Sequence, residues 1–232
     1  MTARTGAETA RTEAEALVSA ASGAGGGVTT ALYLPGVNGN NVSTPGTPAM
    51  RGAVLDIRAA LAPLDTVAGT IAALSDETAT DKCWWFYYSS SVLRFRTSSD
   101  GSATVLHSAS VSLPFVSGSL LWVRVVWVQG SPSDTATFYT STDGKTWTQL
   151  GTVRSVATQG ALYATPNPLR VGSSGQFVNV TAQLAQRLEV RSAIDGPVVA
   201  SWDGRAPAAR YRDPQGNIWT VNGTANAWQV IS

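Results

Sequence analysis

Turn signals that contain glycine separate short runs of alternating apolar and polar residues, and they limit the fold of this chain more than any other feature. Asp-Gly pairs stand at 100–101 and 143–144, and Asp-Pro-Gln-Gly stands at 213–216. Asp-Gly is a strong hairpin signal, because glycine adopts positive φ freely and aspartate tolerates it. The pattern predicts an all-β fold, a two-sheet antiparallel jelly-roll sandwich of about twelve to fourteen strands.

Residue alternation locates individual strands between these turns. The odd positions of 121–128 are all apolar, and the even positions are nearly as apolar. We therefore expect this strand to be central and covered on both sides. Segments 135–141 and 184–191 alternate more strictly, which predicts half-buried strands. Among the large side chains, we expect three to lie in the core: Trp127, Phe138 and Trp202.

The N-terminal residues differ from the rest of the chain. Ala7–Ala21 is rich in alanine and glutamate, which predicts a helix, and glycines at 23 and 25–27 predict a hinge. Leu17 and Val18 are its only large apolar residues, so the helix is marginal alone. It is either a disordered tail or a docking arm that orders against a partner or against copies of itself. We favour the arm, with Leu17 and Val18 as candidate attachment residues, and divide the chain into residues 1–27 (arm) and 28–232 (sandwich).

Composition excludes several classes of partner. The 232 residues carry a net charge of +1 and no basic run, so we expect no nucleic acid partner. No apolar run approaches the roughly 20 residues of a membrane span, and no secretory signal pattern is visible, so we expect no membrane insertion. Cys83 is the single cysteine, which rules out an intrachain disulfide.

The residues that usually carry catalysis are scarce. His107 is the only histidine, so it cannot build a histidine-based zinc site, and we expect a structural or surface role. Glu77 and Glu189 are the only glutamates after residue 28. Most aspartates stand beside glycine or at strand ends, where bonds to their own backbone explain them: Asp56, Asp65, Asp100, Asp143, Asp195, Asp203 and Asp213. We therefore predict no enzyme activity, no cofactor and no metal, although calcium at an aspartate-rich rim is an alternative.

Two local motifs suggest binding. Ser141–Trp147 resembles the Asp-box of sialidases but is one residue short, so we expect a hairpin turn followed by a packed tryptophan. Residues 84–88 read Trp-Trp-Phe-Tyr-Tyr. Strand alternation sends Trp85 and Tyr87 to the face opposite the other three, where they are candidates for stacking on a sugar ring. A strand covered on both faces and a protein interface are the alternatives.

The order of these motifs resembles a known family. Leu32–Pro45, Leu120–Trp127 and Ile194–Asp203, together with the closing Asp213–Gly223, are similar to the concanavalin A-like, laminin-G-like jelly roll of virion proteins in actinobacterial phages. The resemblance spans about Val28–Ser232 and carries over no binding residues.

What the resemblance implies is a non-catalytic structural protein of the virion. It would be a minor tail or fibre protein or a capsid decoration protein, attached through its N-terminal arm. Its expected partners are other virion proteins and copies of itself, with host-surface glycans as a further candidate. The alternative is a carbohydrate-binding module of a secreted or cell-surface bacterial protein.

Overall fold

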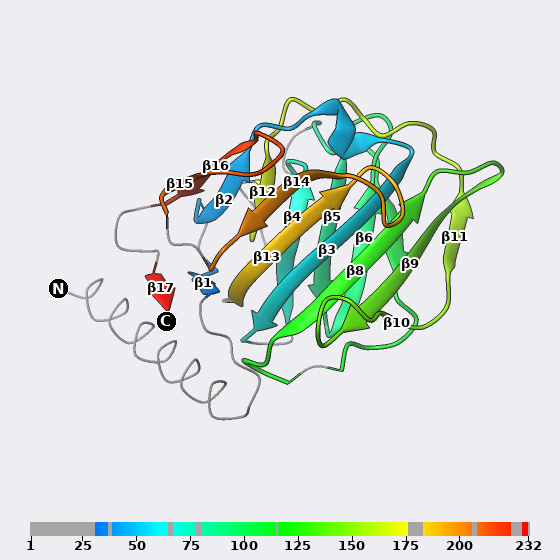
Figure 1. The fold of residues 1–232 in the computed structure, drawn as a ribbon. Coiled ribbons are helices and arrows are strands. Elements are labelled where there is room, and N and C mark those ends of the chain that lie inside the picture. The colour runs from blue at the N-terminus through cyan, green and yellow to red at the C-terminus, as the bar shows by residue number, and fades with distance from the viewer. Residues whose placement is uncertain are drawn as a thin grey trace.

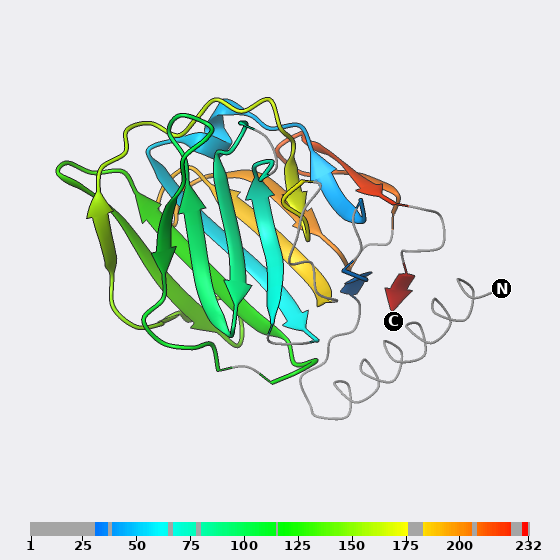
Figure 2. The same cartoon turned by 180° about the vertical axis from the view of Figure 1, so that it is seen from behind.

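The computed structural model describes residues 31–36, 39–64, 67–77, 80–114, 116–175, 183–205, 208–223 and the backbone of 229–231. These residues form two facing antiparallel sheets with one short 3-10 turn, η1 (Pro48–Arg51), so the predicted all-β fold class is confirmed (Figures 1 and 2). The predicted arm, with Leu17 and Val18, lies outside the described residues and stays a prediction. In the described part, no helix has the length and apolar character needed to cross a membrane.

The front sheet in Figure 1 has nine strands, which we call sheet A. Its main path runs β10 (Thr148–Gln149), β9 (Ser133–Ser141), β8 (Leu121–Val128), β3 (Val54–Pro63), β13 (Gln183–Arg191), β1 (Ala31–Leu34) and β17 (Gln229–Ile231). β11 (Arg154–Ala157) also pairs with β9, and β14 (Val198–Asp203) also pairs with β13. β8 therefore lies inside the sheet, as predicted, between β3 and β9.

The second sheet, sheet B, has eight strands and is best seen in Figure 2. Their order is β15 (Arg210–Arg212), β16 (Ile218–Asn222), β2 (Asn41–Thr44), β12 (Leu169–Val171), β4 (Ala68–Leu74), β5 (Trp84–Ser89), β6 (Val92–Thr97) and β7 (Val105–Ser108). Seventeen strands are thus described, and the expected count of about twelve to fourteen was wrong. Four of the strands are only two or three residues long, which is too short for an alternating pattern.

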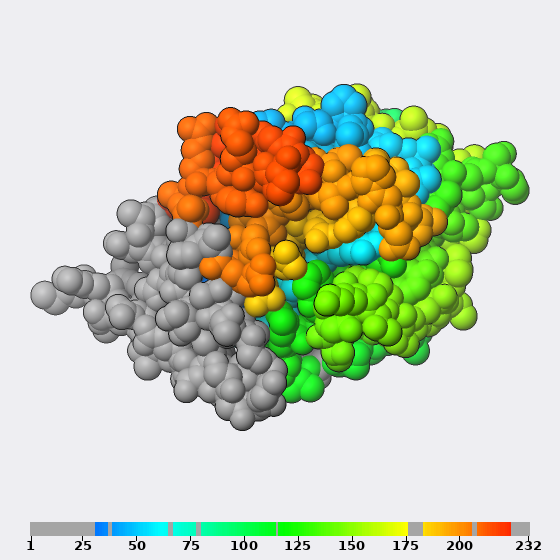
Figure 3. All heavy atoms as spheres, in the orientation of Figure 1, coloured from blue at the N-terminus to red at the C-terminus, as the bar shows by residue number. Residues whose placement is uncertain are grey.

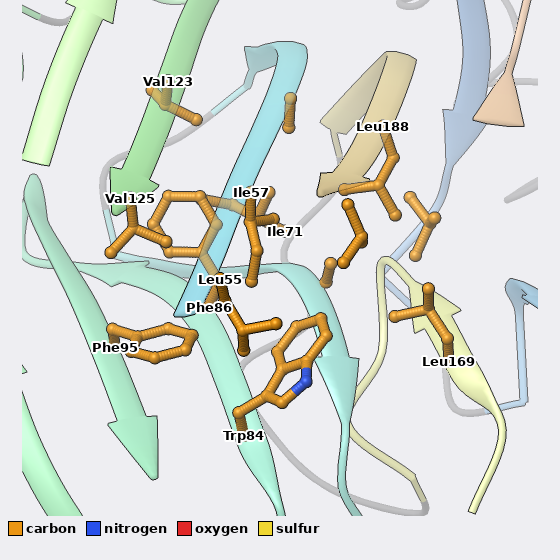
Figure 4. Close-up of a cluster of buried hydrophobic side chains, with 14 of the residues drawn as sticks. Leu55, Ile57, Ile71, Trp84, Phe86, Phe95, Val123, Val125, Leu169 and Leu188 are labelled. Carbon is orange, nitrogen blue, oxygen red and sulfur yellow. The ribbon is translucent and has the colours of Figure 1, made fainter. Parts of the chain in front are cut away.

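The main hydrophobic core lies between the two sheets (Figure 4). Trp127, Phe138 and Trp202 are at most 5% exposed there, which confirms their prediction as core residues. Trp84, another core ring, donates a hydrogen bond from Nε1 to the Met50 carbonyl at 2.8 Å. Because it also includes Leu32 and Trp219, the core joins residues from near both ends of the described chain.

The Asp-Gly turns at 100–101 and 143–144 have the same internal network. Asp143 accepts backbone N–H bonds from residues 145 and 146 at 2.8 Å, and the Gly144 N–H donates to the Ser141 hydroxyl at 2.9 Å. Asp100 and Ser98 repeat this arrangement in the turn between β6 and β7. The bonds from Thr146 and Lys145 lower the pKa of Asp143, because they stabilise its carboxylate. The Asp-box-like segment is therefore a hairpin turn, as predicted, and Trp147 packs against Trp122.

Candidate functional site

The predicted sugar-binding pair lies on the outer face of sheet B. Trp84, Phe86 and Tyr88 belong to the core, whereas Trp85 and Tyr87 form a separate cluster with Ala73, as the alternation predicts. The Trp85 and Tyr87 rings stack on one another, with centroids 4.0 Å apart and planes 17° apart. They are only 4% and 2% exposed, so strand β5 is covered on both faces.

The side chain of Arg96 lies against this aromatic pair. The Arg96 guanidinium lies 5.3 Å from the Trp85 ring centroid and 5.5 Å from that of Tyr87, and its nearest acid is Glu77 at 3.6 Å. Arg94 is directly opposite Tyr87 in the sheet register. The two rings thus pack against each other, and the Arg96 guanidinium lies within cation–π distance of both. Sugar stacking at Trp85 and Tyr87 stays a prediction.

A denser polar cluster lies on the outer face of sheet A, and sequence reasoning missed it. Asp56, in β3, is fully buried and accepts hydrogen bonds from Nε and Nη2 of both Arg58 and Arg124, at 2.6–3.1 Å. The backbone N–H of Asp195 donates to the same carboxylate at 2.9 Å. The Asp195 carboxylate in turn contacts both guanidinium groups. We call these four residues the Asp56 cluster.

Aromatic rings close over the guanidinium groups of the Asp56 cluster. The Trp147 ring centroid is 5.7 Å from the guanidinium carbon of Arg58 and 5.6 Å from that of Arg124. The ring centroid of Tyr139, on the neighbouring strand β9, lies 5.3 Å from the guanidinium carbon of Arg124. Figure 3 shows this face, where the residues around β10 and those around β14 stand above the strip of β3 between them.

The charges of the Asp56 cluster balance one another, as in a structural ion-pair network. Two carboxylates face two guanidinium groups, and the buried carboxylate accepts five hydrogen bonds. Burial alone would raise the pKa of Asp195, but its bonds to Arg58 and Arg124 lower it overall. Asp56 is an exception to the general expectation of turn and strand-end aspartates, because it lies within β3. The spacing Asp56-x-Arg58 on a strand, which puts both side chains on one face, was the available signal.

The one histidine of the chain, His107, is buried without hydrogen-bond partners among the described residues. His107 is fully buried on β7 next to the Phe95 ring, with centroids 6.5 Å apart. Neither ring nitrogen has a hydrogen-bond partner among the described residues. Burial lowers its pKa to about 4, against a smaller opposing effect of Asp134. His107 is therefore buried rather than on the surface, and its structural role stays a prediction.

Cys83 and Asp213 are two further side chains that could carry chemistry, and both are buried. Cys83 is fully buried, and burial raises the pKa of its thiol to about 12, so it stays protonated. Asp213 accepts a hydrogen bond from the Asn217 backbone at 2.7 Å and another from the Trp219 indole at 3.2 Å. Within the described ranges, no group of three or more histidine, cysteine, aspartate or glutamate residues is placed to hold a metal ion.

Comparison with known proteins gives only a partial structural likeness. No family model and no curated protein matches the sequence. Among solved structures, the chain is similar to a native heptameric SAP-like pentraxin from Limulus polyphemus, with 15% identity, a TM-score of 0.48 and coverage of 71% of this chain and 76% of that one. Domains LG4-5 of the mouse laminin alpha1 chain give 13% identity, a TM-score of 0.49 and coverage of 76% and 44%.

A third similar structure is the CBM40 of a Ruminococcus gnavus sialidase bound to α2,3-sialyllactose, at 7% identity, with a TM-score of 0.46 and coverage of 70% and 91%. At such low identity and TM-score, these likenesses say nothing about ligands. The assignment to a two-sheet jelly-roll sandwich rests on the strand order and pairing of this chain itself.

Proposed function

We propose that this chain is a non-catalytic structural module of a bacteriophage virion, displayed as a minor tail or fibre protein or as a capsid decoration protein. The observation that carries the non-catalytic part is the state of the reactive side chains. His107 and Cys83 are buried in uncharged form, and the buried carboxylate of Asp56 is bound by two arginines. A general acid, base or nucleophile needs access to its substrate, and these groups have none.

The virion role is supported by the sequence resemblance, which runs in the same order along residues 28–232. The sandwich supplies a rigid body for display. We assign attachment to the N-terminal segment, because Leu17 and Val18 are too few to order a helix alone and need a surface to cover them.

Virion incorporation tests this assignment directly. Purified phage particles that encode the chain should contain it, as detected by antibody labelling in electron micrographs, which also separates head from tail. A chain lacking residues 2–26 should fold but fail to enter the particle. Absence of the full-length chain from purified virions would refute the proposal.

Host-surface glycan binding is the second part of the proposal and has its own test. Full-length protein is applied to a glycan array, and Trp85→Leu is compared with Trp122→Leu, which changes a partly exposed ring on the outer face of sheet A. Loss of binding in Trp85→Leu alone places the sugar on Trp85 and Tyr87. Glycan binding by a chain that never enters virions would favour the alternative, a carbohydrate-binding module. Turnover of any glycan that a single carboxylate substitution abolishes would make the protein an enzyme.

A further inference from the structure

Arg187 lies on β13 in the interior of sheet A, and its side chain points outward from the sandwich (Figure 1). The next residue, Leu188, is buried in the core, so strand alternation sends Arg187 to the outer face. In the sheet register, Arg187 stands opposite Ala60 on β3 and opposite Asp203 on β14. Because Ala60 is small, the Arg187 guanidinium can reach across it toward β8.

The ring of Trp122 supports this guanidinium. Trp122 stands opposite Ala60 on β8, and the guanidinium carbon of Arg187 lies over the ring, 6.0 Å from its centroid. The turn at Gly144 packs so closely against the same ring that a Cβ on this glycine would lie 2.6 Å from it. Trp147 contacts Trp122 edge-on, with centroids 6.5 Å apart. Trp122 is therefore held in place, and its cation–π contact restricts the Arg187 side chain.

Arg187 has N–H donors that no described residue uses. Its ion pair with Asp203 joins Nε to Oδ2 at 3.7 Å, which is too long for a hydrogen bond. Asp203 instead accepts two hydrogen bonds from the Arg205 side chain, at 2.9 and 2.6 Å. Among the described residues, the Arg187 guanidinium thus makes no hydrogen bond, and its side chain is 38% exposed. These donors are therefore accessible from solvent.

Three other arginines of this face use their donors within the protein. Arg58 and Arg124 each donate two hydrogen bonds to one buried carboxylate. Arg191 donates to Glu189, the acid of β13, at 2.8 Å. These acids are thus engaged by other arginines, and Arg187 keeps a positive charge that no hydrogen-bonded acid of the described residues balances.

We propose that Arg187 is the anion-binding residue of a site for an acidic sugar on the outer face of sheet A. A guanidinium presents parallel N–H groups that match the two oxygens of a carboxylate. The contact with Trp122 already restricts this side chain, which lowers the entropy lost on binding. Trp122 and Trp147 are both partly exposed, so apolar ring surface lies beside the cation. A sugar acid, which joins a carboxylate to a ring with apolar C–H groups, fits both features.

This site differs from the pair of Trp85 and Tyr87 in its place and in its chemistry. It lies on the other sheet, and it selects for negative charge rather than for ring stacking alone. The inference goes beyond the proposed function, because it adds a second ligand contact. It depends neither on virion incorporation nor on sugar stacking at Trp85.

Titration of the full-length protein with glucuronate at constant ionic strength, followed by NMR, tests the site. The readout is the indole N–H resonance of Trp122, which is assigned by its absence in Trp122→Leu. This resonance should shift and saturate with a Kd of roughly a millimolar, as expected for a ligand of monosaccharide size. Glucose has the same ring without the carboxylate and should bind about tenfold more weakly or less.

Variants of Arg187 separate its role from a general charge effect. Arg187→Gln should raise the Kd for glucuronate about tenfold or more, because it removes the charged fork. Arg187→Lys keeps the charge and should give an intermediate Kd. Arg210→Gln makes the same charge change at an exposed arginine of sheet B and is the matched control, expected to leave the Kd unchanged. Trp85→Leu should also leave it unchanged, so failure of this site and failure of sugar stacking at Trp85 are distinguishable.

Three results would overturn the proposal: an equal response to glucose, an unchanged Kd in Arg187→Gln, or tighter binding of inorganic phosphate than of glucuronate. In the last case the site would serve a phosphate group and not a sugar acid. The Arg187 side chain is partly exposed and makes no hydrogen bond to the described residues, so its variants should keep the fold. Thermal unfolding of each variant checks this.

Discussion

Asp56 and His107 are both fully buried, but the protein accommodates them in opposite ways. Asp56, on the outer face of sheet A, is surrounded by two guanidinium groups and a backbone N–H. His107, in the core, has no hydrogen-bond partner among the described residues. One group is buried with compensating partners. The other is buried in its neutral form, because the core lowers its pKa to about 4.

The difference shows what kind of disturbance each site tolerates. A compensated charge depends on its partners, so removing any of them leaves an unpaired charge. A neutral buried histidine depends on pH, because protonation would place a charge in the core. Mutation and pH should therefore act on different parts of the molecule.

The largest effect is expected from Asp56→Asn, which leaves Arg58 and Arg124 with only the exposed carboxylate of Asp195. We expect a loss of about 3–5 kcal/mol in the free energy of unfolding, as for other broken buried ion pairs. Urea denaturation at neutral pH measures it. Glu189→Gln removes a partly exposed partner of Arg191 and should cost at most about 1 kcal/mol. Equal losses of unfolding free energy in the two variants would contradict the expected difference between a buried ion pair and a partly exposed one.

A pH effect of intermediate size should come from His107. Its pKa is 6.5 in the unfolded chain and about 4 in the folded protein. Between these values the unfolded state binds a proton that the folded state excludes, so stability falls as the pH decreases from 6.5 to 4. The full loss is about 3 kcal/mol at roughly 1.4 kcal/mol per pH unit.

His107→Leu isolates this contribution, since leucine has a similar volume and no charge. The variant should unfold with nearly wild-type stability at pH 7 and should show a much smaller decrease toward pH 4. Urea titrations of both proteins at several pH values check this. A wild-type decrease that persists unchanged in the variant would assign the pH effect to the aspartates instead.

The smallest effect is expected from Arg96→Ala. Its side chain is 33% exposed, its acid partner is 3.6 Å away, and its main contacts are the Trp85 and Tyr87 rings. We expect a loss of about 0.5–1 kcal/mol, measured by urea denaturation, with an altered near-ultraviolet spectrum from the uncovered rings. If Arg96→Ala lowered the free energy of unfolding as much as Asp56→Asn, the exposed fraction of the side chains would not explain the difference between the outer faces of sheets A and B.

The sequence was sufficient to predict features that depend on neighbouring residues. The Asp-Gly turns and the alternation of β5 and β8 follow from local backbone preferences, and the structure has both. The full number of strands was not predicted, because strands as short as β11 and β17 are defined by their pairing with β9 and β1.

The Asp56 cluster was missed for the same physical reason. Its members come from β3, β8 and the turn before β14, and no local pattern shows that Arg124 and Asp195 meet Asp56. For Trp85 and Tyr87, alternation predicted the face but not the mutual stacking or the cover by Arg96. Alternation defines only the face of a sheet on which a side chain lies, whereas register and tertiary contacts decide what surrounds it.

The bond from the Asp195 backbone to Asp56 spans 139 residues, which has a consequence for the order of folding. It requires the turn before β14 to meet β3, and the pairing of β13 with β3 brings the two together. Contacts of such high sequence separation are expected late on the folding pathway. Asp195 has a φ of +53°, which asparagine also accepts, so Asp195→Asn removes the charge without straining the turn. The variant keeps the backbone bond and weakens the contacts of the residue 195 side chain with Arg58 and Arg124. If these contacts form after the transition state, the substitution should speed unfolding and leave the refolding rate nearly unchanged, so the turn at Asp195 would set the lifetime of the folded sandwich.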